Sequence, residues 1–123
     1  MRLTVMLSAL GCALVLSGCA PTGLYAWGDY ADDMFKHEQN DLTDQEYLAR
    51  IEADLKASEK AGYRIPPGLY ADVGTANLKL GNAEAALVYY EKERNLWPES
   101  RDFMDMLIKG VKRNLESFKG TAK

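Results

Sequence analysis

The chain has 123 residues, of which 15 are Lys or Arg and 18 are Asp or Glu, and its formal net charge is −3 at neutral pH. This length accommodates one small domain. The acidic balance argues against a nucleic-acid partner, because nucleic-acid binding depends on neutralising phosphates with basic side chains.

The N-terminus has the organisation of a secretory signal. Arg2 supplies a positive charge, and residues 3–16 form an uncharged apolar segment. That segment is shorter than the ~20 residues of a membrane-spanning helix. A short string follows it directly, and this string resembles the bacterial lipobox, in which small residues precede a cysteine that receives a diacylglyceryl group. Its residues are Leu16, Ser17, Gly18 and Cys19.

We therefore expect residues 1–18 to be a lipoprotein signal peptide, and residues 19–28 to be a tether whose Cys19 carries the fatty acyl chains, palmitate among them. The alternative is an ordinary signal peptide in which Cys19 stays a free thiol. Ala20 stands where Asp would retain a lipoprotein in the inner membrane, so resemblance to enterobacterial sorting favours the periplasmic face of the outer membrane. After removal of Cys12 and acylation of Cys19, no thiol remains for disulfides, metal sites or nucleophilic catalysis.

The first helix is predicted from Asp29 to about Glu38, with a stripe of large apolar residues. Its members are Trp27, Tyr30, Met34 and Phe35, and Asp32, Asp33 and Lys36 are expected on the solvated surface. The aromatic residues Tyr25, Trp27 and Tyr30 allow two interpretations. We favour packing against the second helix, because Trp27, Tyr30 and Met34 share a helical stripe. The alternative is a membrane-interface belt, in which Tyr25 contacts lipid.

The second helix has clear boundaries. Thr43 and Glu46 have the spacing of a capping box, and Gly62 provides a left-handed stop. Its apolar stripe contains Tyr47 or Leu48, Ile51 and Leu55.

Three more helices follow. The sequence RIPPGLY predicts a turn and a third helix from about Pro67 to Leu80, and the fourth extends from Ala83 to about Leu96. Ser100 is positioned to cap a fifth helix. Its apolar stripe is Phe103 or Met104, Leu107, Val111, Leu115 and Phe118. We therefore expect an all-α domain of about five helices at residues 29–118, followed by a frayed tail at 119–123.

Residues 67–100 resemble a tetratricopeptide repeat, a 34-residue pair of antiparallel helices. The matching positions are Tyr70, Gly74, Gly81, Ala86, Tyr90 and Pro98. Asn77 and Glu93 depart from the pattern, and an unrelated helical hairpin is the alternative. A single repeat must be covered by neighbours, so the fifth helix is expected to act as its cap. The resemblance implies a concave side to which Thr75 and Lys79 point as candidate interaction residues. The alternative is that they are merely exposed or are covered by the first helix. Tyr25 and Trp27, outside the repeat, are further candidate interaction residues.

Four segments together resemble a family of small proteobacterial lipoproteins of unknown function. They are YAWGDY, SEKAGYRIPPGLYADVG, LGNAEAALVYYEKE and PESRDFMDMLIK, which span Tyr25 to Lys109. Members of this family are often encoded beside a CsgG-like outer-membrane secretion lipoprotein. The resemblance therefore implies an accessory part in an export or envelope assembly, with a CsgG-like lipoprotein as partner. It implies no catalytic residues.

Candidate catalytic and metal-binding residues are few. His37 is the sole histidine, and we interpret it as a solvated side chain near a helix end. The aspartates at 32, 33, 41 and 44 lack the glycine and terminal glutamate of a calcium-binding loop. We therefore expect no catalytic residues, metal or cofactor, and interpret the protein as a non-catalytic scaffold subunit rather than an enzyme. The alternative function is binding of a short peptide or small ligand in the periplasm.

Overall fold

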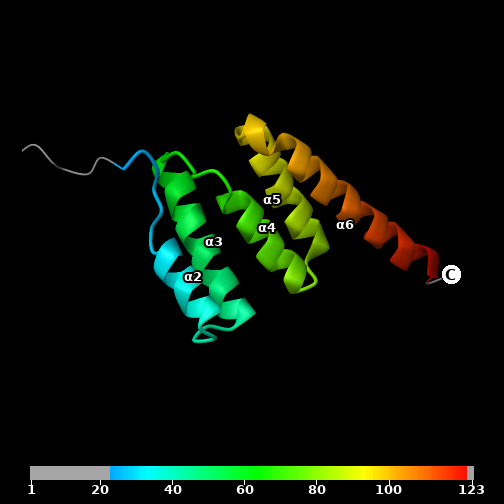
Figure 1. The fold of residues 1–123 in the computed structure, drawn as a ribbon, viewed down its shortest axis with the longest axis horizontal. Helices are drawn as coiled ribbons and strands as arrows, with labels where there is room; N and C mark the ends of the chain where they lie inside the picture. Colours follow the sequence, from blue (N-terminus) through cyan, green and yellow to red (C-terminus); the bar gives the residue numbers. More distant parts are fainter. Residues whose placement is uncertain (1–22, 122–123) are drawn as a thin grey trace, which may run out of the picture.

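The structure, a computed structural model, describes residues 23–121, and these fold into helices without any strand (Figure 1). The elements are α2 (Tyr30–Glu38), α3 (Asp44–Ala61), α4 (Leu69–Lys79), α5 (Ala83–Leu96), the 3₁₀ turn η1 (Pro98–Ser100) and α6 (Arg101–Thr121). The predicted all-α fold is confirmed. The predicted signal peptide, its recognition residues Leu16, Ser17 and Gly18, and Cys19 lie outside the described residues.

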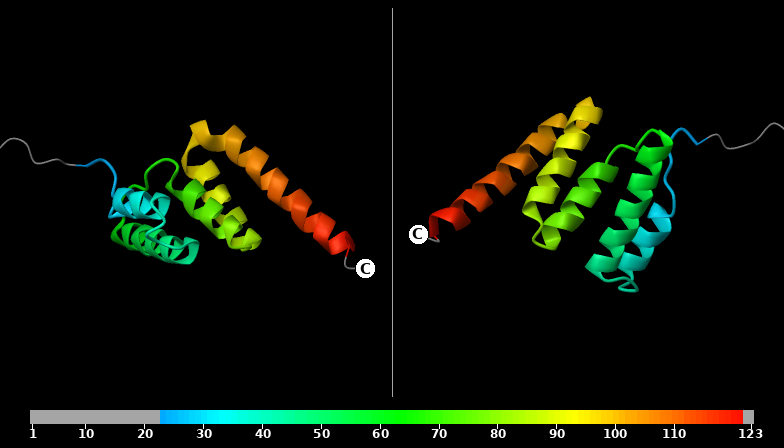
Figure 2. Two further views of the ribbon diagram at one scale, coloured as in Figure 1. Left: turned by 60° about the horizontal axis from the view of Figure 1, so that its bottom comes forward. Right: turned by 180° about the vertical axis from the view of Figure 1, so that it is seen from behind.

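The helices are arranged as successive antiparallel pairs. Helices α2 and α3 lie side by side, α3 packs against α4, and α4 forms a tight hairpin with α5 (Figures 1 and 2). Helix α6 packs against α5 and continues past the end of it. The α4–α5 hairpin is therefore covered by α3 on one side and by α6 on the other.

Apolar side chains form two clusters, one on either side of the hairpin. The first joins α3 to the loop before α4 and to α4 itself, and contains Tyr47, Leu48, Ile51, Leu55, Ile65, Leu69, Tyr70, Val73 and Ala76. The second joins α5 to α6, and contains Ala86, Tyr90, Met104, Ile108 and Val111. All four predicted apolar positions of the second helix are buried, including both Tyr47 and Leu48.

Local signals define the ends of α3 as predicted. The Glu46 backbone N–H donates to Thr43 Oγ1 at 3.2 Å, and the Thr43 backbone N–H donates to Glu46 Oε2 at 2.9 Å. This reciprocal pair is a complete capping box. Gly62 ends the helix with φ +74°, a left-handed conformation that favours glycine.

Close approach within the α4–α5 hairpin depends on a small residue in α4. Gly74 is buried, and a Cβ atom built on it would lie 2.8 Å from Tyr90 Cε1. Ala86, one turn before Tyr90 in α5, is fully buried, and Tyr70 is buried in the first cluster. Gly81 forms the tight turn between the two helices with φ +82°.

Three predicted boundaries are wrong. Helix α4 begins at Leu69 and not at Pro67, because Gly68 at φ +91° interrupts the helical backbone. Ser100 does not cap the last helix; its hydroxyl donates to Glu93 Oε1 at 3.1 Å, and Pro98 opens the η1 turn. Helix α6 continues to Thr121, so its residues 119–121 are helical where we expected a frayed tail.

Two predicted core positions of the last helix also differ. The predicted apolar stripe includes either Phe103 or Met104, and the structure has Met104 buried and Phe103 exposed. Phe118 is 74% exposed, and it belongs to the last turns of α6, a helix that continues past the end of α5 (Figure 1). In α2, Met34 and Phe35 of the predicted stripe are exposed as well, whereas Asp33 is buried.

Candidate functional site

A small pocket of about 100 Å³ lies where the C-terminal halves of α2 and α4 meet the N-terminal part of α3. We call it the α2–α4 pocket. It is lined by Met34, His37, Glu38, Asp44, Tyr47, Asp72, Thr75, Ala76 and Lys79. Two predicted interaction residues, Thr75 and Lys79, therefore share one site with His37, which we predicted to be a solvated side chain near a helix end.

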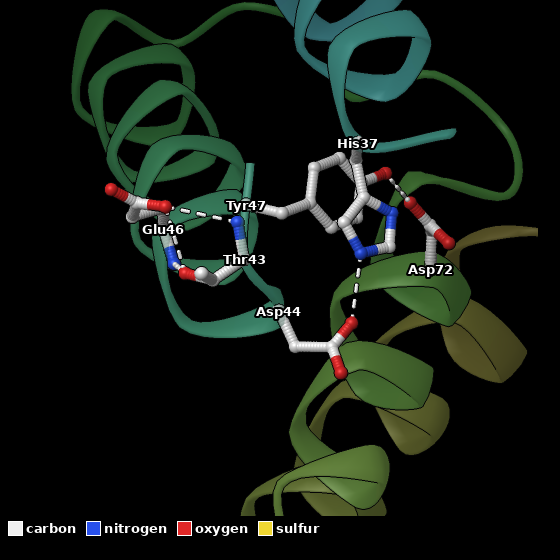
Figure 3. A network of polar contacts seen from close by, with 6 residues as sticks. All are labelled: His37, Thr43, Asp44, Glu46, Tyr47 and Asp72. Carbon is white, nitrogen blue, oxygen red and sulfur yellow. Dashed lines mark hydrogen bonds and ion pairs between the residues drawn. The ribbon is translucent and has the colours of Figure 1, made fainter. Parts of the chain in front are cut away.

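His37 is held in this pocket by two contacts. Its ring stacks on Tyr47 with centroids 4.4 Å apart and planes 11° from parallel, and its Nε2 lies 2.8 Å from Asp44 Oδ1 (Figure 3). The short turn after α2 makes this possible, because Asn40 at φ +63° reverses the chain and brings the start of α3 beside the end of α2. The prediction of a solvated His37 is wrong, since its side chain is mostly buried.

Asp72 of α4 accepts hydrogen bonds from two tyrosine hydroxyls. Tyr47 donates to Asp72 Oδ2 at 2.5 Å (Figure 3), and Tyr30 donates to the same oxygen at 3.2 Å. Burial, and then the Asp72 charge and hydrogen bond, raise the pKa of Tyr30 to about 12. Burial also raises the pKa of Tyr47, with further contributions from Asp72. Both hydroxyls therefore stay protonated at neutral pH and bind α4 to α2 and α3.

The two predicted residues of α4 differ in their availability. Thr75 Oγ1 donates to the Ala71 carbonyl at 2.9 Å and lies 3.1 Å from the Tyr90 hydroxyl, so its hydrogen-bonding capacity is used within the hairpin. Lys79 is exposed at the rim of the pocket. Thr75 and Lys79 are both exposed, which agrees with the alternative that these residues are merely exposed, and α2 packs chiefly on α3.

The N-terminal aromatic residues form a continuous row that we call the aromatic seam, comprising Tyr25, Trp27, Tyr30 and Trp97. Tyr25 packs edge-on against the buried Trp97 at a centroid distance of 5.9 Å, and Trp27 lies 5.8 Å from Tyr30. Arg64 lies 4.9 Å above the Trp97 ring. Tyr30 packs against the first cluster as predicted, but Tyr25 packs on Trp97 and Trp27 remains 45% exposed. The chain is thus packed from Tyr25 onward, and the predicted tether of residues 19–28 is wrong in its last four residues.

Sequence reasoning missed the buried carboxylates. Asp33 is buried and pairs with Arg50 at 2.9 Å, which corrects its predicted place on the solvated surface. Glu93 is completely buried, and its Oε1 accepts from the Gly68 backbone N–H at 2.7 Å. A signal for Glu93 was present, because it follows Tyr90 by three residues and therefore lies on the apolar face of α5.

The α2–α4 pocket gathers His37 and the carboxylates of Glu38, Asp44 and Asp72. Even so, within the part of the chain that the structure describes, no group of three or more His, Cys, Asp or Glu side chains could hold a metal ion. His37 lies beside carboxylates in this pocket, as an active site would require. The nearest hydroxyl group of α4, on Thr75, donates its hydrogen bond to the Ala71 carbonyl of the same helix. Within residues 23–121, no helix is both long and apolar enough to cross a bilayer.

A family model described as a domain of unknown function, DUF4810, matches residues 24–107. The chain belongs to this family. The DUF4810 match begins at the aromatic seam, includes the whole α2–α4 pocket and ends within α6. Neither the curated proteins nor the solved structures contain a match to the chain. The resemblance to a family of unknown function is thereby confirmed.

Proposed function

We propose that this DUF4810 protein is an outer-membrane-anchored lipoprotein that serves in the periplasm as a non-catalytic interaction subunit of an envelope assembly. In this proposal Cys19 carries the lipid anchor, and the α2–α4 pocket receives a side chain of the protein partner. The lipobox string supports the anchor. The resemblance of the α4–α5 hairpin to a tetratricopeptide repeat supports a role in protein recognition.

The observation that carries the proposal is the size and lining of the α2–α4 pocket. Sites for small molecules typically have volumes of about 300–1,000 Å³ and mainly apolar walls. This pocket has about 100 Å³, and carboxylates, an ammonium group and an imidazole stand among the apolar atoms of its wall. Such a volume suits one side chain presented by another protein better than a free metabolite.

The charges of the pocket indicate which side chain would fit. Glu38, Asp44 and Asp72 contribute three carboxylates, against the single ammonium group of Lys79 and the imidazole of His37, which lies against Asp44. Met34 and Ala76 provide apolar surface beside them. A lysine or arginine side chain satisfies both parts, because its aliphatic stem packs on apolar atoms while its charged end meets carboxylates.

The partner class follows from the family resemblance. The family that the sequence resembles is often encoded beside a CsgG-like secretion lipoprotein, so we propose a CsgG-like export assembly as the site of action. A basic side chain on a periplasmic surface of that assembly would enter the pocket.

Co-purification from detergent-solubilised envelopes tests the pocket. The pocket variants Glu38→Lys and Lys79→Glu change exposed charges at its rim, and Lys109→Glu makes a matched change on α6. We expect Glu38→Lys to lower recovery of the CsgG-like lipoprotein several-fold, and Lys109→Glu to leave it unchanged. Equal recovery with all three variants would contradict the proposed docking site. A metabolite bound stoichiometrically in native mass spectrometry would favour the ligand-binding alternative instead.

Cell fractionation tests the anchor separately. We expect Cys19→Ser to move the protein from the membrane fraction to the soluble periplasmic fraction, because each buried CH₂ of the lost acyl chains contributes about 0.8 kcal/mol to membrane binding. Unchanged membrane retention of this variant would refute lipidation as the anchor.

A further inference from the structure

We infer that the bilayer itself covers the end of the domain at which the chain begins, so that the domain lies directly on the membrane in one orientation. We call this surface the membrane-proximal end; it comprises Leu24, Lys60, Tyr63 and Arg64. The inference rests on the acylation of Cys19 in the proposed function, and it adds the surface that meets the lipid and the direction in which the pocket faces.

The length of chain before the packed domain sets the distance to the membrane. Tyr25, the first packed residue, is the sixth residue after Cys19, and a fully extended chain advances at most ~3.3–3.6 Å per residue, so the two residues lie within about 22 Å of each other. From Tyr25 onward, the chain is held by contacts with the rest of the domain. Tyr25 packs on Trp97, and the Asp29 backbone N–H donates to Asp54 Oδ2 at 3.0 Å.

The polar layer of a bilayer leaflet is itself about 5–8 Å thick. An acylated Cys19 at the base of that layer therefore leaves at most about 17 Å between the headgroups and Tyr25, the first packed residue. The N-terminal segment approaches the domain beside the C-terminal end of α3 and the loop that leads to α4 (Figure 1). The side chains at that end are consequently the ones within reach of the headgroups.

These side chains have the chemistry of a membrane interface. Leu24 is 68% exposed and Tyr63 is 63% exposed, although both are large and apolar. Lys60 and Arg64 are exposed beside Tyr63 in the sequence, and Arg64 also lies over the rings of Tyr25 and Trp97. Tyrosine is enriched at the headgroup layer, and basic side chains near the surface are attracted to anionic lipid.

The orientation places the α2–α4 pocket at the opposite end of the domain. Helix α3 has 18 residues and is therefore about 27 Å long. Tyr63 follows its C-terminal end, whereas Asp44 begins it and lines the pocket. Lys79 lies at the C-terminal end of α4, on the same distal side (Figures 1 and 2). The pocket would thus face the periplasm, away from the lipid.

Fluorescence quenching in vesicles tests this orientation. The acylated chain has no free thiol, so Tyr63→Cys and Lys79→Cys each introduce one labelling site. The labelled, acylated protein is incorporated into phosphatidylethanolamine vesicles that contain a minor share of phosphatidylglycerol and a headgroup-quencher lipid. We expect several-fold stronger quenching at position 63 than at position 79. Equal quenching at the two positions would overturn the inference.

A pair of serine variants separates contact from simple proximity. Leu24→Ser should weaken quenching at position 63, whereas Phe118→Ser removes a similarly exposed apolar side chain from the far end of α6 and should not. Co-flotation of each protein with the vesicles reports the anchor. Acylated protein that fails to float would overturn both the proposed function and this inference. Floating protein with unchanged quenching in Leu24→Ser would overturn the lipid contact alone.

Discussion

Replacement of Gly74 by alanine tests the packing of the α4–α5 hairpin. The added Cβ would lie 2.8 Å from Tyr90 Cε1, 2.9 Å from Tyr90 Cδ1 and 3.2 Å from the Ala86 carbonyl oxygen. Carbon atoms pack best at about 3.5–4.0 Å, so the ring would have to move by about 0.7 Å. The Tyr90 ring is buried, and its hydroxyl lies 3.1 Å from Thr75 Oγ1. The ring therefore cannot shift without disturbing the hairpin and the second cluster.

The magnitude follows from two opposing terms. Overpacking of a well-packed core costs about 1–3 kcal/mol. Alanine is favoured over glycine within a helix by about 1 kcal/mol. Gly110 of α6 provides the matched control, because a Cβ there meets no atom within 4 Å. The propensity gain is common to Gly74→Ala and Gly110→Ala, so the difference between them isolates the overpacking cost of about 1–3 kcal/mol.

Urea denaturation of the domain measures this difference, and thermal melting provides a second reading. A change of 1 kcal/mol shifts the melting temperature of a domain this size by about 4–8 °C. We expect Gly110→Ala to be slightly more stable than the wild type and Gly74→Ala to be the less stable variant of the two. The cost of Gly74→Ala should shrink in a Tyr90→Leu background, because the colliding ring is then absent. Equal stability of the two alanine variants would refute the proposed close approach.

Three further predictions concern single polar groups. The pKa of Tyr30 rises from 10.0 to about 12 in the folded protein, so its contribution to stability is present below pH 10 and is lost as the pH rises towards 12. In denaturant titrations at increasing pH, the free energy of unfolding should therefore decline less steeply for Tyr30→Phe than for the wild type. Glu93→Ala should lower the free energy of unfolding by about 1–3 kcal/mol, because the Gly68 backbone N–H loses its acceptor, while Glu93→Gln retains an acceptor and should lose less. Thr43→Ala should cost about 1 kcal/mol and speed amide hydrogen exchange at Glu46, and unchanged exchange there would argue against the capping box.

The family resemblance and the helical fold could be derived from the sequence because their signals are local. Thr43 and Glu46 are three residues apart, and Gly62 and Gly81 each require a left-handed backbone at a helix end. Apolar residues at intervals of three and four define the buried faces of α3 and α6. These interactions form within one or two turns of a helix, so neighbouring residues determine them.

The partners of the charged residues could not be derived in this way. Tyr30 and Asp72 are separated by 42 positions, and Glu93 and Gly68 by 25, yet each pair forms a hydrogen bond. Such pairs depend on how each helix is rotated and translated against the next. An apolar stripe allows several rotations of similar energy, and a carboxylate beside it then lies in solvent or in the interface according to which rotation is adopted.

His37 shows the consequence for the candidate site. Its sequence neighbours indicate only a polar residue near a helix end. Stacking on Tyr47 and pairing with Asp44 arise because the turn after α2 brings the start of α3 alongside it. The sequence by itself determined where most of the helices begin and end and which residues form most of their apolar faces, through short-range backbone and capping interactions. The tertiary structure alone decided which acidic and aromatic side chains meet, because those contacts join residues that only helix packing brings within hydrogen-bonding distance.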